Sequence, residues 1–83
     1  MNRNILIEFA SSLSEDDLKF LYTRLNERLS GDVAEALDFM SHYKALDSQL
    51  SVAKSAFEVY NICDSVTEVL HKECRKRNLQ FDR

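Results

Sequence analysis

The sequence predicts a single-domain, all-α protein, and two observations carry this prediction. Glycine occurs once, at Gly31, and proline is absent, so nothing after residue 31 forces a positive φ or removes a backbone N–H. Apolar residues between 39 and 60 recur in alternating steps of four and three, the spacing of a helix that packs along another helix. These residues are Phe39, Tyr43, Leu46, Leu50, Ala53, Phe57 and Tyr60. We call this row the apolar seam.

Length and composition exclude several classes of protein. A compact chain of 83 residues buries roughly 60% of its unfolded surface, which is enough for one core in one domain, 1–83. With 45% apolar and 30% charged residues, the chain is too hydrophobic to be disordered. No apolar run approaches the roughly 20 residues of a membrane span, and the region after Met1 does not resemble a signal peptide. We therefore expect a cytoplasmic protein without membrane contact, in which Cys63 and Cys74 are reduced core thiols.

Local signals define the first two helices. Ile5, Leu6 and Phe9 have helical spacing and predict a helix over about 4–12. Ser14 stands three residues before Asp17, the arrangement of a capping box, and predicts the start of a second helix over about 15–29.

The corner after the second helix is expected at Gly31. Glycine suits the left-handed conformation that ends many helices, and Asp32 with Glu35 is a start signal for the next helix. A connection this short favours antiparallel neighbours, so the second and third helices should form a hairpin.

The third helix is expected over about 32–77. Asp47, Ser48 and Ser51 are potential N-caps, so a break near 47–51 is the alternative. We favour continuity because the apolar seam keeps its register through this stretch. A helix of this length would extend roughly 70 Å at 1.5 Å per residue.

A helix of that length would outgrow the hairpin helix beside it, so its apolar side chains should meet a second copy or another protein. The expected assembly is a homodimer with a helical-bundle or coiled-coil-like core. The predicted interface residues are Phe39, Tyr43, Leu46, Leu50, Phe57, Tyr60, Val66 and Leu70.

Charge is unevenly distributed over the chain. The net charge is −3, yet the segment 71–83 is a basic tail with five cations against two acids. One interpretation is that these cations complement the negative end of the helix dipole, and the other is that they contact a partner. The candidate contact residues are Lys72, Arg75, Lys76 and Arg77.

No arrangement of residues indicates catalysis, a cofactor or a metal. His71 and Cys74 share a helix face, but zinc requires four converging ligands and no C-x-x-C motif is present. A buried thiol is poorly ionised, and one glycine cannot form a phosphate-binding loop. We therefore expect a protein that is not an enzyme.

The leading interpretation is a small regulatory or adaptor protein that inhibits or modulates a partner by stoichiometric binding, as do many small proteins of phages and mobile elements. One alternative is a transcription regulator that binds DNA directly or through a DNA-binding partner, because Gly31 could form the corner of a helix-turn-helix. The helix after that corner begins with acidic residues, which would repel phosphate, so direct contact with nucleic acid is not expected. A structural component of a larger assembly is a second alternative.

One stretch resembles part of a known family. The segment LSEDDLKFLYTRLNERL, 13–29, resembles a helix of the Hha/YmoA group of small all-helical nucleoid-associated modulators, which act by binding a DNA-binding partner. The resemblance is mostly an amphipathic pattern, and the second half of the chain departs from that group. We therefore assign no residue roles from it.

Overall fold

The computed structural model describes residues 3–27 and 30–79, and these residues form five α-helices and no strand. This confirms the all-α class. Among the described helices, none combines the length and the apolar character that crossing a membrane requires. The helices are α1 (Arg3–Ser12), α2 (Glu15–Glu27), α3 (Ser30–Ser41), α4 (Lys44–Ser51) and α5 (Ala56–Lys76).

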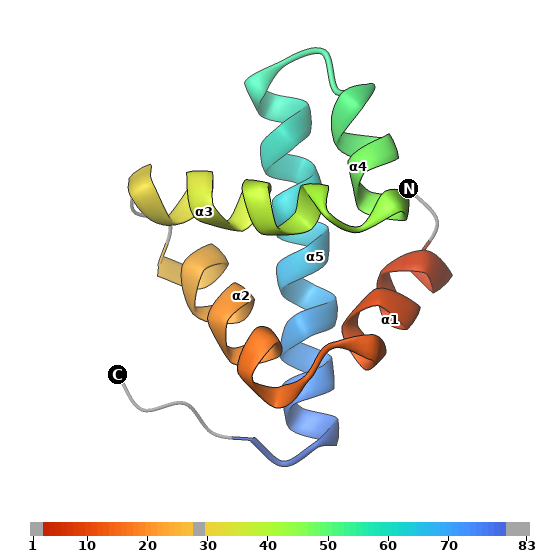
Figure 1. Ribbon diagram of the computed structural model, residues 1–83, viewed down its shortest axis with the longest axis vertical. Coiled ribbons are helices and arrows are strands. Elements are labelled where there is room, and N and C mark those ends of the chain that lie inside the picture. The colour runs from red at the N-terminus through yellow and green to blue at the C-terminus, as the bar shows by residue number, and fades with distance from the viewer. Residues whose placement is uncertain (1–2, 28–29, 80–83) are drawn as a thin grey trace.

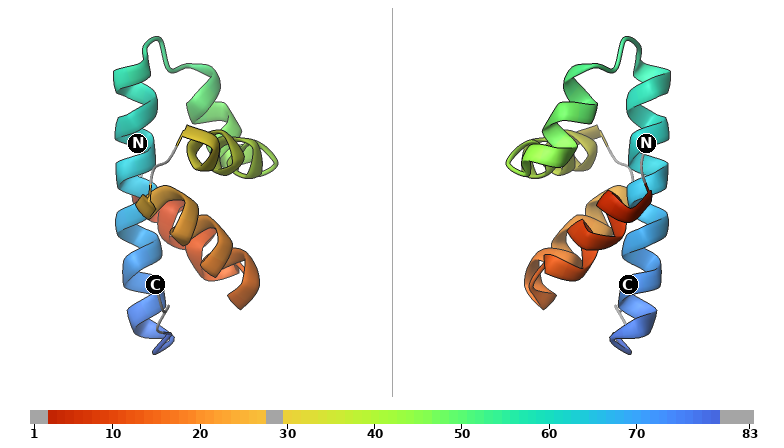
Figure 2. Two further views of the ribbon diagram at one scale, coloured as in Figure 1. Left: turned by 90° about the vertical axis from the view of Figure 1, so that its left-hand side faces the viewer. Right: turned by 90° about the vertical axis from the view of Figure 1, so that its right-hand side faces the viewer.

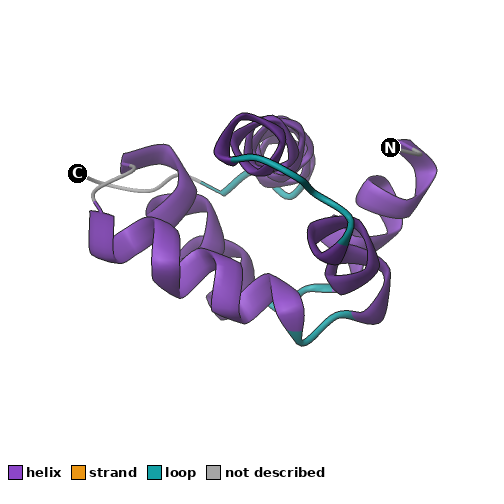
Figure 3. Cartoon of the chain, turned by 90° about the horizontal axis from the view of Figure 1, so that it is seen from above, coloured by secondary structure: helices purple, strands orange, loops and turns teal. Residues whose placement is uncertain are grey.

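Helix α5 is the axis of the fold. Its 21 residues extend about 31 Å, close to the longest dimension of the molecule, 36 Å. Helices α1 and α2 lie beside its C-terminal half, α4 lies beside its N-terminal half, and α3 crosses it (Figure 1). All four lie on one side of α5, so its opposite side is not covered by the described chain (Figure 2; seen from above in Figure 3).

A single copy of the chain builds its own core. Its radius of gyration is 11.9 Å, and a compact domain of this length has about 11.8 Å. The largest fully buried side chains come from four of the five helices: Leu18, Leu21, Leu25, Met40, Leu46, Cys63, Val66 and Leu70.

The expected start of the second helix is confirmed. Ser14 Oγ accepts a hydrogen bond from the Asp17 N–H at 3.1 Å, and Leu13 and Leu18 are both buried beside this turn. The role expected of Gly31 is wrong, because Gly31 lies inside the first turn of α3 and its φ is not positive. The expected end of the second helix near Leu29 falls outside the described residues.

The expectation of one continuous helix over 32–77 is wrong. Three helices occupy this stretch, and a rod of roughly 70 Å would be about twice the longest dimension of the molecule. The breaks lie at 42–43 and 52–55, rather than at 47–51. The chain reverses between α4 and α5, so the two halves of the apolar seam lie on different helices (Figure 1).

Side chains at the end of α3 explain the first break. The carbonyl of Asp38 accepts hydrogen bonds from Ser41 Oγ at 2.7 Å and from His42 Nδ1 at 2.8 Å. Short polar side chains that bind nearby carbonyls compete with the helical hydrogen-bond ladder. Tyr43 then takes an extended conformation (φ −104°, ψ 116°) and precedes the first residue of α4.

A cap at the start of α5 explains the second break. Ser55 is extended, and its Oγ accepts a hydrogen bond from the Glu58 N–H at 3.2 Å. The Glu58 carboxylate accepts one from the Lys54 N–H. The segment from Ser55 to Glu58 thus has the S-x-x-E pattern of a capping box, and this pattern starts a new helix without glycine or proline.

Helix α5 ends in a Schellman motif. Asn78 has φ 61°, and its N–H binds the Arg75 carbonyl at 3.1 Å. The Leu79 N–H binds the Cys74 carbonyl at 2.9 Å, and Leu79 packs against the core. The end of the predicted basic tail, from residue 80, lies outside the described residues.

Candidate functional site

The predicted interface residues divide into three groups by exposure. Leu46, Val66 and Leu70 are buried in the core of the single chain. Phe39, Tyr43 and Leu50 are half-buried and pack against that core. Only Phe57 and Tyr60 are exposed.

Phe39 and Tyr43 belong to a row of aromatic contacts within the chain. The ring centroids of Phe9 and Tyr43 lie 4.8 Å apart in an edge-to-face arrangement. Phe39 lies 5.5 Å from Tyr43 and 5.7 Å from Phe20. Burial, with a smaller contribution from the charge of Asp17, raises the pKa of the Tyr43 hydroxyl. This row joins α1, α2 and α3, so its aromatic side chains stabilise the monomer.

Phe57 and Tyr60 form an exposed apolar surface that we call the aromatic face. Phe57 is 73% exposed and Tyr60 48%. Val52, in the connection between α4 and α5, is 66% exposed. Phe57 and Tyr60 are three residues apart on α5 and therefore lie on neighbouring positions of one helix surface. The core residues of α5 occupy the opposite side of the helix, so the two aromatic side chains face outward.

A hollow of about 210 Å³ lies at the same end of the molecule, between α4 and α5. Its lining includes the apolar side chains of Val52, Ala53 and Ile62. The other lining residues, Gln49, Glu58 and Asn61, are polar, so the hollow has a mixed lining.

The four candidate basic residues have different surroundings. Lys72 and Lys76 line a second hollow, between α1 and α5. Arg77 is directed to Glu73 and to the end of α1, where its guanidinium forms hydrogen bonds. Arg75 is exposed and does not line the hollow.

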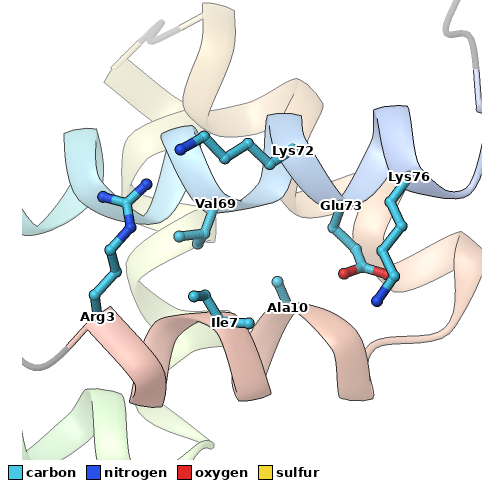
Figure 4. A pocket seen from close by; sticks show the side chains of 7 residues that line it. All are labelled: Arg3, Ile7, Ala10, Val69, Lys72, Glu73 and Lys76. Carbon is cyan, nitrogen blue, oxygen red and sulfur yellow. The ribbon is translucent and has the colours of Figure 1, made fainter.

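We call this second hollow the basic groove. Helices α1 and α5 run parallel beside it. The contacts that join the two helices pair residues 65, 66 and 67 positions apart in the sequence, and a nearly constant separation indicates parallel helices. Its volume is about 210 Å³. Figure 4 shows Ile7 and Val69 facing each other across the groove, with Arg3 at one end and Lys76 at the other. The lining residues are Arg3, Ile7, Ala10, Val69, Lys72, Glu73 and Lys76.

Glu68 binds two of the cations at the groove. Arg3 Nη2 donates to Glu68 Oε1 at 2.8 Å, and Lys72 Nζ lies 3.3 Å from the same oxygen. The hydrogen bond from Arg3, followed by that from Lys72, lowers the pKa of the Glu68 carboxyl. In the part of the chain that the structure describes, no carboxylate forms an ion pair with Lys76.

Arg77 fixes the other end of the groove. Its Nε donates to Glu73 Oε2 at 2.7 Å, and its Nη2 donates to the carbonyls of Ala10 at 3.3 Å and Ser11 at 3.1 Å. These carbonyls belong to the last turn of α1, where the Ala10 carbonyl also accepts a hydrogen bond from the Leu13 N–H at 3.3 Å. Glu73 is only 8% exposed, and Arg77 neutralises it. The pair therefore holds α1 against α5.

The histidines and cysteines do not form a reactive cluster. A hydrogen bond of 3.0 Å joins the Tyr22 hydroxyl and His71 Nδ1. Cys63 and Cys74 are buried and are not joined in a disulfide, and burial raises the pKa of Cys74. Within residues 3–27 and 30–79, no three or more His, Cys, Asp or Glu side chains are placed to hold a metal ion together.

The surface considered for the alternative of a helix-turn-helix is acidic in the structure. Helix α3 carries Asp32, Glu35 and Asp38. Arg24 of α2 lies 3.6 Å from Asp32 and 3.2 Å from Glu35. An acidic helix in this position does not favour contact with phosphate.

No protein-family model, curated protein or solved structure matches this chain.

The α1 side of the basic groove was not found from the sequence. The excess of cations in the tail indicated Lys72 and Lys76, but nothing local indicates Arg3, Ile7 or Ala10 as their neighbours. The one available signal is the spacing of four that separates Arg3 from Ile7 and Lys72 from Lys76, which places each pair on one helix face.

Proposed function

We propose that the protein is a small cytoplasmic regulatory or adaptor protein that acts by stoichiometric protein–protein binding, and that it associates as a homodimer through the aromatic face. One observation carries this proposal: Phe57, a large aromatic side chain, is 73% exposed on the side of α5 that no described helix covers. Contiguous apolar side chains on a folded surface are typical of interaction sites.

Shape favours a second copy as one partner. A symmetric dimer interface uses the same patch on both subunits and must be self-complementary. The aromatic face has a protruding side chain, Phe57, and the hollow between α4 and α5 offers it the apolar side chains of Val52, Ala53 and Ile62, beside the polar ones of Gln49, Glu58 and Asn61. In this arrangement the Phe57 of each copy enters the hollow of the other.

The expected affinity is modest. Burial of one large apolar side chain contributes about 1.5–3 kcal/mol, and two copies together bury four such side chains from Phe57 and Tyr60. Association costs about 4–15 kcal/mol in lost freedom of motion. The most favourable ends of these ranges leave about 8 kcal/mol, so dissociation at about micromolar concentration is the tightest that we expect. Such an interface could exchange its second copy for a different protein.

Sedimentation velocity over a series of protein concentrations tests the proposal. The expected result is a rise in mass toward that of a dimer, and Phe57→Asp should keep the chain monomeric with an unchanged helical circular-dichroism spectrum, because Phe57 is exposed in the monomer. Ala34→Asp, which adds the same charge at an exposed site on α3, is the matched control and should not affect the dimer. A wild-type chain that stays monomeric at submillimolar concentration would contradict the homodimer. An unchanged association of Phe57→Asp would contradict the aromatic face.

A further inference from the structure

The basic groove combines apolar side chains with cations on a protein that is acidic overall. The net charge of the chain is −3, whereas three cations, those of Arg3, Lys72 and Lys76, line this site. Glu68 beside it pairs with Arg3 and Lys72, and Glu73 in its lining pairs with Arg77. The apolar part of the groove includes Ile7, which is 48% exposed and lies opposite Val69 (Figure 4). The groove therefore offers an apolar contact flanked by positive charge.

The size of the groove limits its occupant. Pockets for drug-sized molecules have about 300–1,000 Å³, and this groove has about 210 Å³. It can accept one or two side chains of a larger partner that rests on its rim. Lys72 and Lys76 are one helical turn apart, about 6 Å along α5, which matches the separation of residues four apart on a second helix.

The charges within the groove favour a peptide over a continuous anionic surface. Glu68 and Glu73 lie among the cations, and a membrane surface or a nucleic-acid backbone would bring phosphates against these carboxylates. A helix with separated carboxylates can place each carboxylate beside a cation of the groove. The same helix can place an apolar side chain over Ile7. Recognition of an amphipathic helix in a groove is a common mode of peptide binding.

We infer that the basic groove between α1 and α5 docks an acidic amphipathic helix of a partner protein, with one apolar side chain over Ile7 and Val69 and carboxylates at Lys72 and Lys76. This inference rests on the proposed function, because it assumes a protein as the partner. It concerns a different surface from the aromatic face, so the chain could bind its partner and a second copy at the same time.

The first experiment titrates the full chain with a synthetic helical peptide of Ala, Leu and Glu, in which Glu residues four apart flank a Leu. Amide chemical shifts measured by NMR should change along α1 and the C-terminal half of α5. Binding should weaken with rising salt, because exposed charges are screened within about 10 Å at 0.1 M. A peptide with Lys in place of Glu, and one with Ala in place of the central Leu, should both bind less tightly.

A pair of adjacent variants provides the matched control. Lys76→Glu should weaken binding of the Glu peptide about five- to tenfold at low salt, whereas Arg75→Glu, with the same charge change outside the groove, should leave it within about twofold. Ile7→Ser should also weaken binding, and both side chains are exposed enough for the variants to fold.

Three results would overturn the inference. The first is an equal loss of affinity for the Glu peptide in Lys76→Glu and Arg75→Glu. The second is equal affinity for the Lys peptide and the Glu peptide. The third is binding to vesicles of anionic lipid that is tighter than binding to the Glu peptide and depends on Lys76 and Ile7. The effect of Phe57→Asp on self-association tests the proposed function separately, so failure of one can be distinguished from failure of the other.

Discussion

The pair of Glu73 and Arg77 gives the sharpest test of how α1 is held in the fold. Arg77→Ala removes a hydrogen bond of 2.7 Å to a carboxylate and two longer ones to the carbonyls of Ala10 and Ser11. Hydrogen bonds to charged groups contribute about 1.5–3 kcal/mol, and breaking a fully buried pair costs about 3–5 kcal/mol. The Arg77 side chain is 25% exposed, so water can reach part of the site. We therefore expect a loss of about 2–3 kcal/mol in the free energy of unfolding.

Chemical denaturation followed by circular dichroism measures this loss, and thermal unfolding should show a fall of roughly 8–20 °C for a domain of this size. Arg75→Ala is the matched control, because Arg75 is exposed on the same helix, and its effect should stay within about 0.5 kcal/mol. Glu73→Gln added to Arg77→Ala should recover about 1 kcal/mol, since an unpaired amide is less costly to bury than an unpaired carboxylate. A loss below about 0.5 kcal/mol for Arg77→Ala, or no recovery in the double variant, would refute the reasoning.

Two further predictions concern a glycine and a carboxylate. Gly31→Ala should stabilise the chain by about 0.4–1 kcal/mol in denaturant titration. Gly31 lies in a helical turn with a φ that is not positive, and nothing lies within 4 Å of an added Cβ. A loss of stability would contradict the assigned backbone conformation. The lowered pKa of Glu68 predicts a contribution to stability that is present above the unfolded-state pKa and disappears as the pH falls through the lower folded-state pKa. In a carboxyl NMR titration, Arg3→Ala should raise the pKa of Glu68 more than Lys72→Ala does, and the reverse order would show that Lys72 is the stronger partner.

Of the local signals in the first half of the chain, the cap at Ser14 was predicted correctly and the corner at Gly31 was not. The cap at Ser14 depends on residues within one helical turn, so the sequence alone contains the information needed. The capping box from Ser55 to Glu58 is equally local, but the sequence analysis did not identify it. The regular spacing of the seam was misleading, because Leu46 and Leu50 on α4 contact the core whereas Phe57 and Tyr60 on α5 are exposed.

The absence of glycine and proline was a weaker indication of continuity than expected. Ser41 ends α3 by binding a backbone carbonyl with its side chain, and serine is common enough that its position alone does not locate a break. The basic groove could be predicted only in part. Lys72 and Lys76 were indicated by charge, but their approach to Arg3 and Ile7 depends on α1 lying parallel to α5, and this long-range arrangement has no local sequence signal.

The contact between the first and last helices has a consequence for how the chain reaches its folded state. Helices such as α2 and α3 or α3 and α4 can meet locally, and α2 meets α5 across 49 residues at Tyr22 and His71, whereas α1 must find a site more than 60 residues further along the chain. Closing so large a loop carries an entropic cost that grows only slowly with its length, so a few contacts at Arg77 and Glu68 can offset much of it. Docking of α1 on α5 is therefore expected to be a late step of folding. Shortening the chain at either terminus should release the contact between α1 and α5.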